Sequence, residues 1–161
     1  MSPDRRSQRR SLPVLNDDPR GWEFKVAIAF FQLNSRLERC LSDGLVAHRM
    51  TLAQFDVLMT LWHTDGITQQ ELAEWLLVTK ANVVGLIDRV SAAGWVERRP
   101  DAEDRRVNRL YLTEAGRKLV CKAQPGQQAL VKNIFGRLTE AELRQMHALF
   151  GRLDQACSAD G

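Results

Sequence analysis

Five arginines stand close together between Val96 and Leu112 of this chain. A guanidinium group donates several hydrogen bonds in a fixed fork, which suits phosphate oxygens and the edge of guanine. Such a cluster is equipped to recognise a polyanion. A solvated surface loop is the simpler interpretation, so the elements that position the arginines decide between the two. The five are Arg98, Arg99, Arg105, Arg106 and Arg109.

A helix is expected immediately before this cluster. Thr79 can cap its first turn, and Gly94 stands where a left-handed residue commonly closes a helix. Apolar residues fall at helical spacing on one side: Val83, Leu86, Ile87 and Val90. The opposite side is polar, small in its middle and positive, with Lys80, Asn82, Gly85 and Arg89.

A two-stranded hairpin follows the helix. Val96 leads into the first strand, and residues 107–112 are rich in the β-branched and aromatic residues that favour strands. The acidic segment 101–104 between them is typical of a turn. Such a helix suits the wide major groove of DNA, while an arginine on the hairpin can enter the minor groove.

The segment from Asp104 to Gly116, DRRVNRLYLTEAG, resembles the wing signature of the multiple-antibiotic-resistance repressor (MarR) family. The signature is an Asp, an Arg two residues later, then Leu-Thr and a Gly at fixed distance. The preceding residues 87–96 resemble the end of the family's recognition helix, and the resemblance spans about Phe24 to Leu153. It implies a winged helix-turn-helix that binds DNA as a dimer.

The rest of the chain predicts a mainly α fold with a small β-wing. Helices are expected at about 22–43, 52–63 and 113–135 and from 139 to about 156, the second and last opened by capping boxes. A further capping box at 68–71 starts a short helix that pairs with the one after Thr79 as a helix-turn-helix. Ile67 adds a third short strand. Residues 22–157 form one domain, with the winged helix at about 51–113 and dimerisation helices at about 22–48 and 114–157. Residues 1–21 form a basic tail, expected to be flexible, to add phosphate contacts or to pack on a dimer partner.

Composition bounds the class of protein. The chain has 161 residues, 44% hydrophobic, and a net charge of +3, which suggests a polyanionic partner without proving one. We find no apolar run of membrane-spanning length and no secretory signal, and we expect a cytoplasmic protein. No sequence motif of an enzyme, a metal site or a cofactor site is present, so an enzyme is disfavoured and no cofactor or metal is expected.

The predicted DNA-binding residues have different roles. Lys80, Ala81, Asn82 and Gly85 face base edges, while Thr68, Gln69 and Arg89 position the helix on phosphates. The resemblance assigns Arg106 to the minor groove and gives Asp104 the task of orienting a neighbouring arginine. Thr79, Arg99, Arg105, Asn108 and Arg109 complete the set.

The resemblance also implies a homodimer on an inverted-repeat operator, acting as a repressor that a small ligand releases. It places a ligand pocket between the first, second and fifth helices. Candidate linings, each also a plausible core residue, are Phe30, Leu33, Arg36, Leu37, Phe55, Trp62 and His63. An arginine and a histidine among aromatic residues would suit an aromatic acid or a phenol.

Two alternatives stay open. One is a redox-sensing regulator that uses a cysteine. In the family's redox branch the reactive cysteine lies near the start of the first helix, whereas Cys40 lies towards the end of that helix. The other is a winged-helix module that binds proteins and has no DNA contact.

Overall fold

The computed structural model describes residues 21–159, with the exception of the side chains of Lys80 and Ala159. The predicted tail therefore lies outside the described residues, apart from Gly21. The chain divides into two compact units, residues 1–43 and 44–161. The first contributes one long helix, α1 (Gly21–Leu45), which crosses the boundary and ends two residues beyond the predicted position. Many of its apolar side chains are exposed, including Trp22, Val26 and Phe31.

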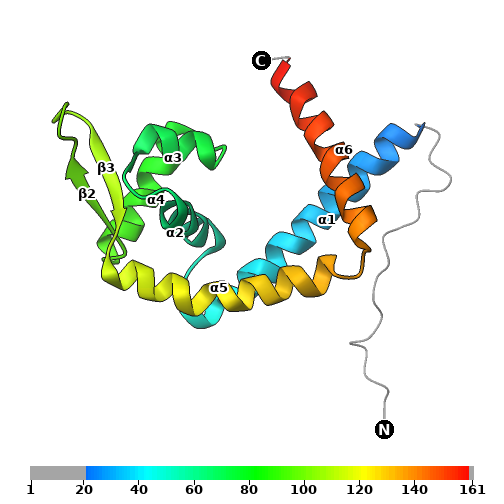
Figure 1. Ribbon diagram of the computed structural model, residues 1–161, viewed down its shortest axis with the longest axis horizontal. Coiled ribbons are helices and arrows are strands. Elements are labelled where there is room, and N and C mark those ends of the chain that lie inside the picture. The colour runs from blue at the N-terminus through cyan, green and yellow to red at the C-terminus, as the bar shows by residue number, and fades with distance from the viewer. Residues whose placement is uncertain (1–20, 160–161) are drawn as a thin grey trace, which may run out of the picture. The chain divides into compact units, whose positions relative to one another are not determined.

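The second unit contains the predicted winged helix-turn-helix (Figure 1). After a 3-10 turn, η1 (Val46–His48), come α2 (Leu52–His63), β1 (Ile67–Thr68), α3 (Gln69–Trp75) and α4 (Lys80–Ala92). The capping boxes predicted at Thr51 and Thr68 both form. Thr79 caps α4 by accepting a hydrogen bond of 3.3 Å from the Asn82 amide. Local capping residues thus set where each of these helices begins.

Helices α3 and α4 end in the same hydrogen-bonded motif but with different residues. After α4, Gly94 has φ +74°, its amide donates to Ser91, and the Trp95 amide donates to Val90. After α3, the Leu77 amide donates to Glu74 and the Val78 amide to Ala73. This motif demands a left-handed residue, and glycine usually supplies it. Leu77 supplies it here with φ +52°, at an expected cost of about 1–2 kcal/mol.

Three antiparallel strands form the sheet, in the order β1-β3-β2. Strands β2 (Val96–Pro100) and β3 (Asn108–Leu112) form a hairpin, which we call the wing, that extends away from α3 and α4 (Figure 1). The register places Arg99 opposite Arg109 and Pro100 opposite Asn108. Strand β3 starts one residue later than predicted because both Val107 backbone groups bond within the turn, to Asp101 and Asp104.

Two helices follow the wing, α5 (Glu114–Phe135) and α6 (Glu140–Ala159). Thr113 caps α5, as predicted, and its hydroxyl also donates to the Gly94 carbonyl at 2.7 Å. Helix α5 continues through Pro125 and packs against α2. Thr139 and Glu142 form the capping box predicted for α6.

The core lies where α2, α4, β3 and α5 meet. The apolar face predicted for α4 is buried in full. Helix α2 has four buried residues: Val57, Leu58 and Leu61 are completely enclosed, and Phe55 is 8% exposed. A helix that is apolar nearly all round is buried on several sides, and α2 thus forms the centre of the second unit. Among the described residues, the largest fully buried side chains are Leu45, Val57, Leu58, Leu61, Leu72, Val83, Ile87, Val90, Leu110 and Val120.

Candidate nucleic-acid interface

Helix α4 presents its predicted reading face to solvent. Ala81, Asn82 and Arg89 are exposed, and so is the capping residue Thr79. A Cβ added to Gly85 would meet nothing within 4 Å, so this part of the helix surface is open to an approaching partner. Lys80 is the first residue of the helix, and its side chain lies outside the described part of the structure.

The start of α3 is occupied by its own capping box. The Thr68 hydroxyl accepts from the Glu71 amide at 3.2 Å, and the Thr68 amide donates to the Glu71 carboxylate at 2.7 Å. Hydrogen bonds that Thr68 donates to the Glu71 carboxylate, first from its backbone amide and then from its side chain, lower the pKa of Glu71. Thr68 therefore fixes the helix start, while the half-buried Gln69 follows as its first residue.

The wing tip holds one arginine in a defined orientation. Asp104 accepts two parallel hydrogen bonds from Arg106, from Nε to Oδ1 and from Nη2 to Oδ2, each 3.0 Å long. The Arg106 amide adds a third bond to Oδ1. The side-chain bonds from Arg106, followed by this backbone bond, hold the pKa of Asp104 below its usual value. Because the Arg106 side chain is still 90% exposed, the guanidinium is oriented and yet available to a partner.

A second aspartate, Asp101, organises the base of the same turn. Its Oδ1 accepts from the amides of Glu103 and Asp104 at 2.8 and 3.0 Å, and its Oδ2 pairs with Arg109 Nε. The Asp104 amide, then the Arg109 guanidinium, lower the pKa of Asp101 to about 2. Arg109 Nη1 also donates to the Gly66 carbonyl at 2.9 Å. We call this set of contacts the wing clasp, since it ties the turn to the loop before β1.

The remaining arginines of the wing differ in their engagement. Arg98 pairs with Asp88 and thereby connects β2 to α4. Arg99 pairs with Glu97, and its guanidinium lies 4.5 Å from the centre of the Tyr111 ring. Arg105 and Asn108 are exposed, and in the described part of the chain Arg105 makes no ion pair. Arg105 and Arg106 thus stand exposed in the turn of the wing, and the Arg99 side chain, 59% exposed, is also accessible from solvent.

Sequence reasoning missed three aspartates that hold the interface together. Asp101 was expected only as a turn residue, and Asp88 only as part of the recognition helix. Asp65 lies just after α2, and its carboxylate accepts from the Leu112 amide at 2.9 Å and pairs with Arg117. All three partners lie at least eight residues away along the chain. Local patterns do not reveal such pairs.

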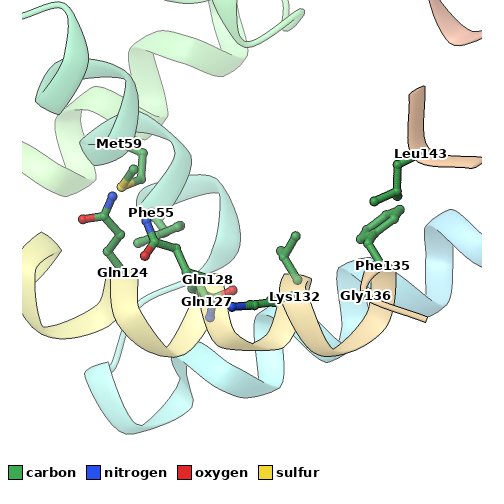
Figure 2. Close-up of a pocket in the computed structure, with 10 residues that line it drawn as sticks. Phe55, Met59, Gln124, Gln127, Gln128, Lys132, Phe135, Gly136 and Leu143 are labelled. Carbon is green, nitrogen blue, oxygen red and sulfur yellow. The ribbon is translucent and has the colours of Figure 1, made fainter. Parts of the chain in front are cut away.

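The predicted ligand residues fall in both units, so the pocket expected between the first, second and fifth helices stays a prediction. Phe30, Leu33, Arg36 and Leu37 lie on α1; Phe55, Trp62 and His63 lie on α2. Within the second unit, an open groove of about 530 Å³ lies between α2, α5 and the start of α6. Figure 2 shows Phe55 and Met59 on its α2 side, with Phe135 and Leu143 facing each other at its other end. Phe55 is the one predicted ligand residue in its lining.

Within residues 21–159, no group of three or more His, Cys, Asp and Glu side chains gathers in a way that could hold a metal ion. None of the helices described is both long enough and apolar enough to cross a membrane. Cys40, Cys121 and Cys157 are free thiols, and all three are exposed.

Comparison with known proteins agrees with this geometry. The family model described as MarR family matches residues 50–107. The multiple antibiotic resistance protein MarR of Salmonella typhimurium is 32% identical over 109 residues, which is 65% of this chain and 76% of that protein. The chain belongs to the MarR family. The transcriptional regulator TtmR of Methylorubrum extorquens is 27% identical over 85% of this chain and 68% of its own length.

A solved structure of a MarR family member shows the same fold in complex with DNA. A cysteine-to-serine variant of MarR from E. coli bound to operator DNA has a TM-score of 0.76 and 25% identity, over 88% of this chain and 99% of that one. MarR family members are transcription regulators, not enzymes. This chain is therefore a DNA-binding transcriptional regulator of the MarR family.

Proposed function

We propose that this protein represses transcription as a homodimer that binds an inverted-repeat operator and is released by a small ligand. One observation carries the DNA-reading part of the proposal: Asp104 orients Arg106 at the wing tip and leaves its guanidinium exposed. An oriented arginine loses little further conformational freedom on binding. Arg106 enters the minor groove, where a narrow A·T tract concentrates negative potential.

Helix α4 reads the adjacent major groove. Asn82 pairs with the edge of an adenine, and Lys80 donates to a guanine. Ala81 and Gly85 allow the helix to approach a thymine methyl closely. Thr68, Gln69, Thr79 and Arg89 set the helix on phosphates, and in the wing Arg105, Asn108 and Arg99 add contacts to the backbone.

Arg109 was predicted to belong to the DNA-binding residues, but in this proposal its main role is to hold the wing in place. Its guanidinium is shared between Asp101 and the Gly66 carbonyl. A phosphate contact by Arg109 would have to compete with both partners. We propose that it mainly holds the wing in register with β1, and so acts on DNA through the position of Arg106.

A homodimer is supported by the apolar side chains that the terminal helices leave exposed. They include Trp22, Val26 and Phe31 on α1, and Leu149 and Leu153 on α6. Large apolar surfaces of this kind usually mark an interface. A two-fold dimer presents two copies of α4 and of the wing, and the operator should therefore be an inverted repeat with half-sites about one helical turn apart.

An aromatic acid or a phenol is proposed as the effector, acting in the cytoplasm where the operator is. Such a ligand relieves repression only if it binds better to a dimer whose recognition helices are wrongly spaced for the operator. The seven candidate residues on α1 and α2 remain the proposed lining of its pocket.

Selection from a random duplex pool at low salt tests the proposal. We expect enrichment of an inverted repeat, and weaker binding of that duplex by an Arg106→Ala variant. Lys122→Ala removes one positive charge from an exposed position of α5 and serves as the matched control. When aromatic acids and phenols are then added one at a time, we expect one of these compounds to release the duplex from the protein. No enrichment by the folded protein would refute the DNA-reading proposal.

A further inference from the structure

The turn between α3 and α4 carries a leucine where the backbone calls for glycine. Leu77 occupies the left-handed position of the motif that closes α3, with φ +52°. Two hydrogen bonds hold it there, from the Leu77 amide to Glu74 at 3.2 Å and from the Val78 amide to Ala73 at 3.1 Å. The equivalent position after α4 is Gly94. The chain thus keeps a leucine at a position where glycine would be free of strain.

The Leu77 side chain contributes nothing visible to the packing of the protein. It is 90% exposed, more than any other large apolar residue in the described part of the chain. Trp75, two residues earlier, is 65% exposed. Backbone strain that is not offset by packing tends to mark a functional site. Leu77 is therefore a candidate for contact with a partner.

The position of Leu77 next to the proposed reading helix favours DNA as that partner. It lies two residues before Thr79, the N-cap of α4, so its Cα is at most about 7.6 Å from the Cα of Thr79. The proposed base-reading residues Ala81 and Asn82 follow directly in the first turn of α4. The major groove is about 12 Å wide, so Leu77 is within reach of the groove wall when the start of α4 enters it.

We propose that Leu77 is a DNA-contact residue that packs against apolar groups lining the major groove, namely thymine methyls and deoxyribose carbons. This inference rests on the proposed function, because it requires α4 to enter the groove by its N-terminus. The contact adds apolar burial beside the polar readout by Asn82. It contributes to affinity without neutralising a phosphate.

Leu77→Gly and Leu77→Asn test this inference, since both residues tolerate the left-handed backbone. Operator duplex obtained by selection is titrated with each variant at several salt concentrations. We expect binding to weaken about tenfold in both, as for loss of a partly buried leucine contact. The dependence of affinity on salt should not change, because no charge is lost. The urea midpoint should stay equal or rise.

Further controls separate the possible outcomes. Val46→Ala alters an exposed apolar residue of η1 and should bind as the wild type does. Replacing thymines of the operator by uracils, one at a time, should weaken wild-type binding at one position and leave Leu77→Gly unaffected there. Unchanged affinity in both Leu77 variants would overturn the inference while the proposed function stands. Wild-type affinity in Leu77→Asn beside a loss in Leu77→Gly would trace that loss to the freer glycine backbone and not to the leucine side chain, and would overturn the inference too. If the wild type bound no duplex at all, both proposals would fail.

Discussion

The backbone of Gly116 lies so close to the Trp95 carbonyl oxygen that a Cβ built on Gly116 would stand only 2.2 Å from it. Trp95 precedes β2, and Gly116 is in the first turn of α5. Two further bonds secure the same junction: the Thr113 amide donates to the Trp95 carbonyl, and the Thr113 hydroxyl to Gly94. The Leu-Thr and Gly of the wing signature are therefore the residues that attach the wing to α5.

Gly116→Ala should destabilise the protein by about 1–3 kcal/mol, the usual cost of forcing an extra carbon into a packed site. The nearest atom is a backbone oxygen, which cannot turn away as a flexible side chain would. The change is read from urea denaturation of the whole protein. Operator binding should weaken as well, because the wing is displaced relative to α4.

Gly126→Ala is the matched control for this prediction. Gly126 also lies inside α5, and a Cβ there would meet nothing within 4 Å. Alanine is the better helix former, so this variant should gain up to about 1 kcal/mol. Equal stability of the two variants would contradict the close approach at Gly116.

Asp104→Asn should reduce the preference for the selected operator over random DNA, although the residue itself carries a negative charge. The substitution removes the charged partner of Arg106, so the Arg106 side chain is no longer held in one orientation. We expect roughly a tenfold loss of affinity for the operator and little loss for random duplex. Arg105→Ala is the contrasting variant: as a phosphate contact, it should weaken both and reduce the salt slope by about one. If the two variants behaved alike, the division of roles in the wing would be wrong.

Protonation of Asp101 should loosen the wing clasp, and the sign follows from its pKa. Folding lowers that pKa from 3.8 to about 2. The ionised carboxylate therefore stabilises the fold above pH 3.8, and this contribution is lost as the pH falls towards 2. Urea midpoints of the wild type and Asp101→Asn should differ at pH 5 and converge near pH 2. A difference that stayed constant over this range would exclude the Asp101 carboxylate as the source of the effect.

Much of the fold follows from local sequence patterns. Capping boxes at Thr51, Thr68 and Thr139 and the buried face of α4 are encoded within one or two turns of helix, and all were predicted. The wing clasp was not, because Asp101 and Gly66 are far from each other in sequence and Arg109 connects them only after the sheet has formed.

The turn at Leu77 and Val78 was predicted as part of the helix-turn-helix, but the left-handed conformation of Leu77 was not. Helix ends are recognised by glycine, as at Gly94, and a leucine gives no such signal. The sequence also could not place the ligand candidates together, since contacts between distant helices are set by packing and not by spacing.

The exposed leucines of α6 are expected to lie in the dimer interface. Leu149 and Leu153 are 46% and 60% exposed, and they follow each other at helical spacing. If a second copy covers them, Leu153→Asp places a charge in an apolar interface, where desolvation disfavours it. Sedimentation should then show dissociation at concentrations where the wild type is dimeric. Operator affinity should fall as well, because two half-sites are no longer bound as one unit.

Gln155→Asp adds the same charge to the opposite side of α6 and should remain dimeric. A monomeric wild type would remove the reason for an inverted repeat, while leaving the contacts of a single wing and its α4 helix intact.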